Sequence, residues 1–395
     1  MIEAVGTRAR GLRPQRAEAV GAASAIRRLD WWLVGATAGL LAFGLWAIHG
    51  ITAHDVTGNP DYFFVRQGIY AAVGVAGALA LLFVDPQFYR RHMWAIYIGT
   101  TGVMLLVLLT GTVSRHSKRW LDIGFFRFQP SEFGKLLFVL FLAAFLADRA
   151  KRLDESRTVL ETIGFGLVPI LLVFVQPDIG TAMVYTAALA AVLFVAGIRW
   201  VHLAAIGVGT LVVILAVLWL LPASGVHLLK DYQAKRLTGF THPDSDPAGA
   251  TYNVAQARNA VGAGGVNGRG VAGATQTKLN FLPEHATDFA FASLAEQRGF
   301  VGVSVLLLLY LLVVWRGLKV IAIARDAFSA IAAGGIVFAF MFQVFVNVGM
   351  NIGVAPVTGI PLPFVSVGGS SMIANLVAIG LLQAICVRGG RRRGV

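Results

Sequence analysis

Two charged residues stand close together in the segment Gln-Pro-Ser-Glu-Phe-Gly-Lys (129–135), which opens a long apolar stretch. Proline and serine are common in the first turn of a helix, and Glu132 there would interact favourably with the helix dipole. Lys135 has no such role. A cation one turn inside a membrane helix is costly unless it faces a wet cavity, so it indicates a functional site. Because the two residues are three positions apart, they could instead simply pair with each other.

Two acidic residues stand at the borders of apolar stretches. Asp178, in Gln-Pro-Asp-Ile-Gly (176–180), is typical of a helix cap; the alternative is an acid in a cavity wall. Asp288, near the end of Pro-Glu-His-Ala-Thr-Asp-Phe (283–289), could also cap a helix. The alternative is a functional role, because an acid at a lipid–water boundary with basic neighbours can serve as a general base.

A polar run, Ser-Val-Gly-Gly-Ser-Ser (366–371), follows a proline-rich stretch at 356–363. Irregular backbone at membrane depth is tolerated where it is buried in protein or lines a water-filled cavity. The free N–H groups of Gly368, Gly369 and Ser370 at a helix start would suit an oxyanion or a phosphate.

The composition places these residues in a membrane. The chain has 395 residues, of which 57% are hydrophobic and 13% charged, and its mean hydropathy is +0.72, which excludes an ordinary soluble protein. A bilayer is crossed by about 20 apolar residues, and windows of that kind predict an all-α polytopic protein with about ten transmembrane helices. The windows are 31–52, 67–85, 93–113, 131–149, 164–177, 180–198, 203–222, 289–315, 330–353 and 372–387. Glu296 and Arg298, in the eighth window, could pair with each other.

The basic residues predict an orientation. Of the 33 Lys and Arg, 20 fall on the side of the two termini, so the positive-inside rule places both termini in the cytoplasm. We therefore expect a disordered basic tail at 1–29, a transmembrane domain at 30–388 and a second basic cytoplasmic tail at 389–395. One large extracytoplasmic loop, at 223–288, lies on the other side.

Cations on the outer side are concentrated in two places. Seven lie in or beside the large loop, and five lie in the segment 114–135 near the fourth window: Arg115, Lys118, Arg119, Arg127 and Lys135. Because cations are disfavoured on that side, this cluster suggests an anionic ligand approached from outside. The alternative is that loops cross the membrane regardless of charge. A net charge of +13 fits phospholipid headgroups or phosphate-bearing substrates better than nucleic acid, because no stretch except the large loop could carry a nucleic-acid-binding face.

Several familiar motifs are excluded. The run Gly268–Gly273 matches G-x-G-x-x-G, but no strand precedes it, so we interpret it as a glycine-rich loop. The sequence has no G-x-x-x-x-G-K-[ST] motif for ATP-driven transport, no Ser-x-x-Lys transpeptidase nucleophile and no cluster with metal-ligand spacing. The lone Cys386 excludes an intrachain disulfide.

Taken together, the motifs resemble those of the SEDS proteins (shape, elongation, division and sporulation), the RodA/FtsW family of peptidoglycan glycan polymerases. The resemblance covers most of residues 30–388, and the Arg-Trp-Leu-Asp form at 119–122 looks more like the elongation branch, RodA, than the division branch, FtsW. The matching motifs are Lys-Arg-Trp-Leu-Asp (118–122), Phe-Gln-Pro-Ser-Glu (128–132), Gln-Pro-Asp-Ile-Gly (176–180), Gly-Ala-Gly-Gly (262–265), Leu-Pro-Glu (282–284), Thr-Asp-Phe (287–289) and Pro-Val-Thr-Gly-Ile-Pro-Leu-Pro-Phe (356–364).

This resemblance implies an inverting glycosyltransferase that polymerises lipid II at the outer face of the bacterial cytoplasmic membrane, with an undecaprenyl-pyrophosphate-linked sugar donor. Asp288 matches the family's essential loop acid, and Glu132 and Lys135 match the conserved polar pair of a central cavity. The sequence departs from the family where Ala286 separates His285 from the Thr-Asp pair. Lys135, Arg119 and Lys118 are the expected pyrophosphate partners, and the other substrate-binding candidates are Gln129, Ser131, Asp178, Gly368, Gly369 and Ser370.

No tightly bound cofactor is expected; a divalent cation, Mg or Mn, could accompany the substrate pyrophosphate, and its ligands are unknown. The resemblance implies a class B penicillin-binding protein as partner, since the chain lacks a transpeptidase nucleophile. Two other functions stay open. A lipid II flippase would need ionisable residues along its whole path, whereas those identified cluster at the outer helix ends. A non-catalytic scaffold for a transpeptidase would leave Lys135 unexplained.

Overall fold

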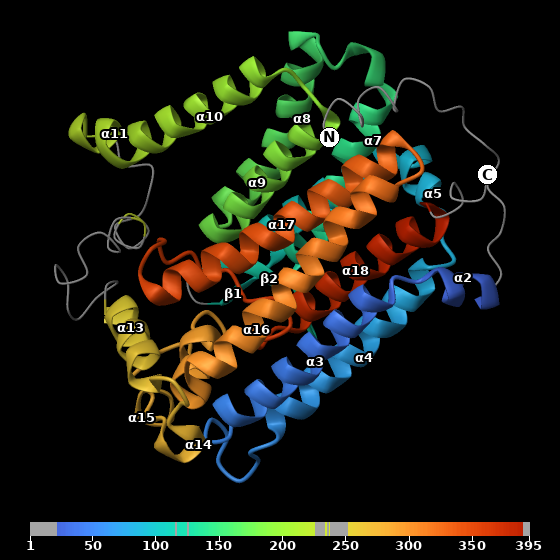
Figure 1. The fold of residues 1–395 in the computed structure, drawn as a ribbon. Helices are drawn as coiled ribbons and strands as arrows, with labels where there is room; N and C mark the ends of the chain where they lie inside the picture. The colour runs from blue at the N-terminus through green and yellow to red at the C-terminus, as the bar shows by residue number, and fades with distance from the viewer. Residues whose placement is uncertain are drawn as a thin grey trace.

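The computed structural model describes residues 22–114, 117–124, 126–225, 234, 237 and 252–389, and the fold is that of an all-α multi-pass membrane protein (Figure 1). Within these described residues, ten helices are long and apolar enough to cross a membrane, which agrees with the predicted number. They are α3 Trp31–Ile51, α4 Tyr62–Leu81, α6 Met93–Thr110, α7 Pro130–Asp148, α8 Ser156–Val175, α9 Ile179–Ala196, Trp200–Ala223 (α10 Trp200–Leu215, a π-helical turn Ala216–Leu220 and α11 Leu221–Ala223), α16 Ala290–Ile323, α17 Ala327–Ile352 and α18 Gly369–Gly389.

The centre of the bundle is formed by α7, α18, α17 and α9. In their most apolar windows 83%, 83%, 72% and 61% of the residues are buried, against none in the α10–α11 span, which extends away from the bundle in Figure 1. Close packing at the centre depends on small residues. A Cβ at Gly44 in α3 would lie 2.1 Å from the carbonyl oxygen of Phe364, and one at Gly380 in α18 would lie 2.5 Å from Cα of Ala78 in α4.

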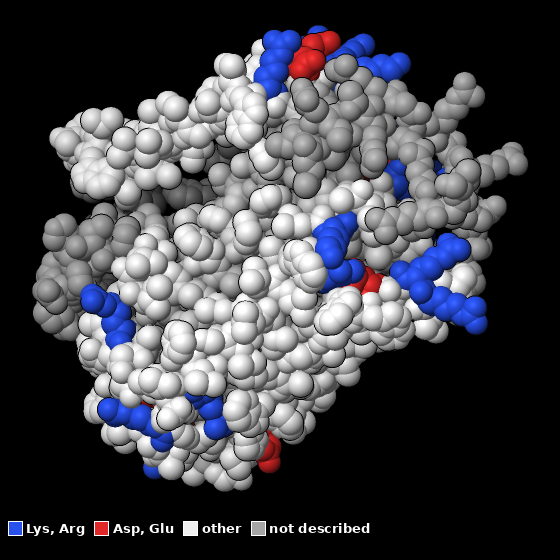
Figure 2. Space-filling view, in the orientation of Figure 1, with Lys and Arg blue, Asp and Glu red and all other residues white. Residues whose placement is uncertain are grey.

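Loops and short elements gather at one end of the bundle, which we call the loop end. It carries residues 52–61, 252–289 and 353–368, and the described part of 111–129. Its short helices are α13 Tyr252–Gly264, α14 Gly270–Gly273 and α15 Thr275–Lys278. Most of residues 226–251, in the predicted large loop, lie outside the described residues. The opposite end carries α2 Ala22–Arg28, α5 Pro86–Arg91 and the 3-10 turn Ala150–Arg152. Lys and Arg gather at the two ends, with an uncharged belt between them (Figure 2).

A three-stranded antiparallel sheet at the loop end was not predicted. It consists of β1 Thr112–Ser114, β2 Ser117–Ile123 and β3 Phe126–Phe128, in the order β1-β2-β3. The turn between β2 and β3 contains Gly124 at φ +58°, a backbone conformation that glycine adopts without strain. The sheet brings Arg119 from β2 close to the starts of α7 and α9.

The predicted disordered tail at 1–29 is wrong for its last residues, because residues 22–28 form α2; residues 1–21, and 390–395 of the second tail, lie outside the described residues. The chain is fixed here by Asp30, whose side chain caps α3 and accepts from Arg316 Nε at 2.9 Å. Gln383 of α18 bonds to both the N–H and the carbonyl of Asp30. These contacts join α3, α16 and α18, and α2 lies in contact with α18.

Candidate active site

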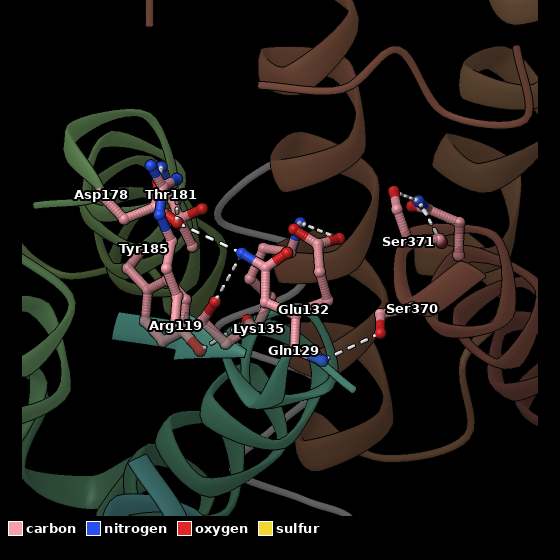
Figure 3. Close-up of polar contacts among 11 residues, drawn as sticks. Arg119, Gln129, Glu132, Lys135, Asp178, Thr181, Tyr185, Ser370 and Ser371 are labelled. Atoms are coloured by element: carbon pink, nitrogen blue, oxygen red, sulfur yellow. Dashed lines mark hydrogen bonds and ion pairs between the residues drawn. The ribbon is translucent and has the colours of Figure 1, made fainter. Parts of the chain in front are cut away.

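Glu132 and Lys135 form an ion pair in the first turns of α7. Lys135 Nζ donates to both carboxylate oxygens of Glu132 at 2.9 Å (Figure 3). The Glu132 side chain is only 2% exposed and the Lys135 side chain 10%. The mutual pairing that the spacing allowed is therefore confirmed. The pair also lines a cavity, so Lys135 satisfies Glu132 and faces an internal space at the same time.

This cavity, which we call the central cavity, has a volume of about 40 Å³ and lies between α7, α16, α17 and α18. It can hold a few water molecules or one group of similar size. Its polar lining consists of the ion pair with Gln343 and Asn375, and the rest is apolar. The apolar lining residues are Leu136, Val139, Val313, Val314, Ile336, Val337, Ala339, Phe340, Ala374, Ala378, Ile379 and Leu382.

Asp178 sits at the start of α9 in a second polar network. Its carboxylate accepts from the Thr181 N–H at 3.1 Å, which confirms the helix-cap interpretation. The same carboxylate pairs with Arg119 Nη1 at 3.2 Å and accepts from Gln129 Nε2 at 3.3 Å (Figure 3). Asp178 is buried and its charge is neutralised by Arg119, while a quarter of the Arg119 side chain remains exposed.

Gln129, Ser131 and Ser370 hold the start of α7 against α18 and α9. The Gln129 N–H donates to Ser370 Oγ at 3.0 Å, and the Gln129 amide donates to Ser131 Oγ at 3.2 Å. Tyr185 of α9 donates to the Ser131 carbonyl at 2.9 Å. These predicted substrate-binding residues thus contact each other and position Arg119 and Glu132.

The predicted anion-binding amide of Gly368 needs a correction. The N–H of Gly368 is not free, because it donates to Gln67 Oε1 of α4 at 3.3 Å. A Cβ at Gly369 would meet the Tyr70 ring at 2.8 Å and the Phe126 ring at 3.0 Å, so this glycine allows α18 to pack closely on α4 and β3. Sequence alone could not show that a glutamine 301 positions away already occupies the Gly368 amide.

Asp288 lies in the segment that leads into α16 and is half-buried. The N-cap residue of this helix is Phe289, so Asp288 does not take the N-cap position that the sequence allowed. Its carboxylate lies beside Gly359, where a Cβ would be 3.4 Å from Asp288 Oδ2. Gly359 has φ +72°, so a glycine turn makes room for the acid.

Four consecutive carbonyls fix the backbone at Asp288. Those of residues 285, 286 and 287 accept from Ser293 Oγ, the Val367 N–H and Ser366 Oγ respectively. The carbonyl of Asp288 itself accepts from Asn347 Nδ2 at 3.0 Å and from Asn351 Nδ2 at 3.3 Å, both in α17. This backbone is therefore held from α16, α17 and the segment before α18, as preorganisation of a reacting group requires.

One loop connects the Asp178 network to Asp288. A Cβ at Gly180 in α9 would lie 2.4 Å from the carbonyl oxygen of Thr358, so the start of α9 is in direct contact with the 356–360 loop. The next residue of that loop, Gly359, is the one beside the Asp288 carboxylate. The candidate base and the candidate cation Arg119 therefore belong to one region of the loop end.

His285, three residues before Asp288, pairs with Asp55 in the loop between α3 and α4, with Nε2 2.9 Å from a carboxylate oxygen. This histidine therefore has its partner in another loop, outside the segment that carries Asp288. Lys118 has no described side chain, and Arg115 lies outside the described residues.

Glu296 holds the end of the large loop, and its predicted pairing with Arg298 is wrong. Its fully buried carboxylate accepts from the Gln276 N–H at 2.8 Å, the Thr277 N–H at 3.0 Å and Thr277 Oγ1 at 2.8 Å. Residues two apart on a helix point in different directions, and the Arg298 guanidinium lies instead over the Trp46 ring at 3.7 Å.

Replacing Glu296 with glutamine should loosen α15 without removing side-chain volume, because an amide group would point an N–H at a backbone donor. Loss of bonds to a charged acceptor should cost about 1.5–3 kcal/mol locally, and amide exchange at 276–277 should accelerate about 10-fold or more. Hydrogen exchange read by mass spectrometry measures this. Glu161→Gln, at the opposite end of the bundle, is the control; equal protection at 276–277 in both variants would contradict the role of Glu296.

The carboxylates of Glu132 and Asp178 are engaged by protein cations, and among the described residues no group of three or more His, Cys, Asp or Glu is placed to hold a metal ion. This part of the protein thus does not fit a metal site built from protein ligands alone.

Comparison with known proteins identifies relatives along nearly the whole chain. The family model FTSW_RODA_SPOVE, described as "Cell cycle protein", matches residues 28–389. The chain is 38% identical over 352 residues to the peptidoglycan glycosyltransferase MrdB of Escherichia coli K12, covering 88% of this chain and 91% of MrdB. It is 35% identical to the stage V sporulation protein E of Bacillus subtilis, covering 89% and 95%. A probable peptidoglycan glycosyltransferase FtsW of Idiomarina loihiensis is 34% identical, covering 88% and 84%.

Two solved structures share the fold. One, described as "Structural coordination of polymerization and crosslinking by a peptidoglycan synthase complex", has a TM-score of 0.77 at 28% identity and covers 92% of this chain and 99% of the other. The second is the rod shape determining protein RodA of Thermus thermophilus, with a TM-score of 0.67 at 26% identity, covering 92% and 98%.

Proposed function

Because the chain belongs to the FtsW, RodA and SpoVE family of cell cycle proteins, we propose that it is a peptidoglycan glycosyltransferase. It joins lipid II units into glycan strands at the outer face of the bacterial cytoplasmic membrane. The observation that carries this proposal is Asp288, an acid whose backbone carbonyl is bound by two buried amides of α17 and whose carboxylate lies at the loop end. The higher identity to MrdB than to FtsW, and the structural match to RodA, favour a role in cell elongation and shape.

In the proposed reaction Asp288 is the general base. It accepts the proton of the acceptor sugar hydroxyl as that oxygen bonds to the anomeric carbon of the donor, and the bond from this carbon to the pyrophosphate breaks. The hydroxyl attacks the anomeric carbon from the side opposite the pyrophosphate, so the configuration at this carbon changes from α to β. Proton transfer of this kind requires a carboxylate within hydrogen-bond reach of the hydroxyl, and the four fixed carbonyls hold Asp288 in place for it.

The departing pyrophosphate needs cations. Lys135, in the central cavity, and Arg119, with its partly exposed side chain, are its proposed partners, together with Lys118. Because the described carboxylates form no metal cage, a divalent cation would come with the substrate pyrophosphate, and no step here is assigned to it.

The competing functions differ in what they require of the helices. A flippase needs ionisable groups along its path, whereas the described charged residues that line the central cavity, Glu132 and Lys135, both lie in the first turns of α7. A scaffold has no use for a buried cation facing a cavity. Purified protein given lipid II in detergent should form glycan strands. Movement of labelled lipid II across vesicles without polymer formation would instead support the flippase.

A partner follows from the same proposal. We expect a class B penicillin-binding protein to crosslink the strands, with its single membrane helix packed on this bundle. The similarity to a chain of a peptidoglycan synthase complex that coordinates polymerisation and crosslinking supports this expectation. Purification from membranes in mild detergent should return the two proteins together.

The proposal places both termini in the cytoplasm and the loop end outside. Cys386 is buried and is the lone cysteine, so a Cys386→Ala background allows new cysteines at exposed Lys278, on the loop end, and exposed Lys151, at the other end. A bulky thiol reagent applied to intact cells should label position 278 alone. Labelling of position 151 instead would reverse the orientation.

A further inference from the structure

Gln343 is a buried amide that the proposed chemistry does not use. It lies in α17, is 3% exposed, and its Nε2 has no hydrogen-bond partner among the residues that the structure describes. It lines the central cavity together with Glu132 and Lys135. An amide donor without an acceptor is costly inside a membrane protein, so its presence indicates that something else supplies the acceptor.

The position of Gln343 relates it to the candidate active site. It is one helical turn from Asn347, whose amide binds the carbonyl of Asp288. It is also nine residues inside the end of α17 at Ile352, which corresponds to about 14 Å at the rise of an α-helix. Gln343 therefore lies deeper in the membrane than Asp288, on the side from which a lipid chain would arrive.

The polar part of the central cavity is rich in donors. Lys135 Nζ carries three N–H groups, and it uses two bonds for the oxygens of Glu132. The unpaired Nε2 of Gln343 adds further N–H groups. A ligand that fits must bring acceptors and must be small, because a cavity of about 40 Å³ admits a group of a few atoms rather than a sugar.

The remainder of the central cavity is apolar, with Val337, Phe340 and Leu382 among its lining residues. An acceptor-rich group joined to an apolar chain matches this combination of donors and hydrocarbon. A phosphate attached to a lipid has both features, and its oxygens can accept from the N–H groups of Lys135, whose charge Glu132 already balances.

We infer that Gln343 is a substrate-binding residue. Its Nε2 donates a hydrogen bond to an oxygen of the lipid-proximal phosphate of the polyprenyl-linked pyrophosphate, and the first prenyl carbons contact the apolar lining of the central cavity. This inference rests on the proposed function, because it takes a lipid-linked pyrophosphate as the substrate.

Gln343→Met tests the inference, because methionine keeps the length of the side chain and removes the polar group. Removing an unpaired buried amide should leave Tm unchanged or raise it, whereas KM for lipid II should rise about 10-fold or more, with a smaller change in kcat. An unchanged KM would overturn the inference and leave Gln343 as a partner of buried water. A lower Tm with an unchanged KM would also overturn it, by showing a structural amide.

A matched control is Gln383→Met in α18. Gln383 is equally buried, but both ends of its amide are bonded to the Asp30 backbone. This variant should lower Tm and leave KM unchanged, which is the opposite pattern to that of Gln343→Met.

A binding measurement separates this inference from the proposed function. In nanodiscs, undecaprenyl pyrophosphate should raise the Tm of the parent protein, and Gln343→Met should lose most of that shift. This result would support the inference even if the parent formed no glycan, which would contradict only the polymerase assignment. A shift of equal size from phosphatidylglycerol, equally reduced in Gln343→Met, would assign the site to phospholipid and overturn the inference.

Discussion

Asp288→Asn is expected to reduce the rate of glycan formation from lipid II by about 100-fold or more, since general-base catalysis contributes about 10²–10⁴-fold. Asparagine has nearly the same shape, and the bonds that fix this segment involve backbone carbonyls, which the substitution does not change. The variant should therefore fold normally and bind lipid II while failing to deprotonate the acceptor. Initial rates with purified protein, together with Tm, measure both effects.

The matched control is Asp61→Asn, an exposed acid at the same end of the bundle, whose partner is His49. It should retain nearly full activity. If Asp288→Asn kept a tenth of the parent rate or more, Asp288 would be a structural residue and the base would have to be another group.

Lys135→Met is expected to have the second large effect, on both stability and activity. It leaves the buried carboxylate of Glu132 without its cation, and breaking a buried pair by removing one partner costs about 3–5 kcal/mol. It also removes the cation proposed to stabilise the departing pyrophosphate. Thermal unfolding and the polymerisation rate should therefore both fall sharply.

A double variant separates these two effects. Replacing both Glu132 and Lys135 with methionine removes the unpaired charge, so stability should largely return. Polymerisation should not return, because the cation in the central cavity is still missing. Recovery of activity in the double variant would make the pair purely structural. Arg127→Ala, which removes an exposed cation of β3, should show little loss in either measurement.

The sequence predicted most of the bundle because the membrane imposes a simple length and polarity rule on its helices. Each of the ten apolar windows overlaps a spanning helix, although α8 begins eight residues before its window, at Ser156, and α16 ends eight residues after its window, at Ile323. Its first turns include Arg157 and Glu161, whose charges place them outside an apolar window. Asp178 as a cap and the pairing of Glu132 with Lys135 were predictable for a similar reason, since both depend on residues within one helical turn.

What the sequence could not predict depends on contacts between distant segments. Two examples are the bonds of Glu296 to the 276–277 backbone and of Gln67 to Gly368. Each bond joins separate elements, so no local sequence pattern predicts it. The amides Asn347 and Asn351 are an exception, because the sequence itself carries a signal for them. They are four residues apart inside an apolar window, where a polar residue indicates a function, and they bind the carbonyl of Asp288.

The most direct test of the central claim is a count of products in one assay. Protein purified from membranes with any co-purifying partner is mixed with saturating lipid II, and glycosidic bonds and released undecaprenyl pyrophosphate are both quantified, in parallel with Asp288→Asn prepared in the same way. We expect the parent protein to release one undecaprenyl pyrophosphate for each glycosidic bond that it forms. Asp288→Asn should still bind lipid II but form almost none of either product. Equal product formation by the two proteins would contradict the assignment of Asp288 as the base.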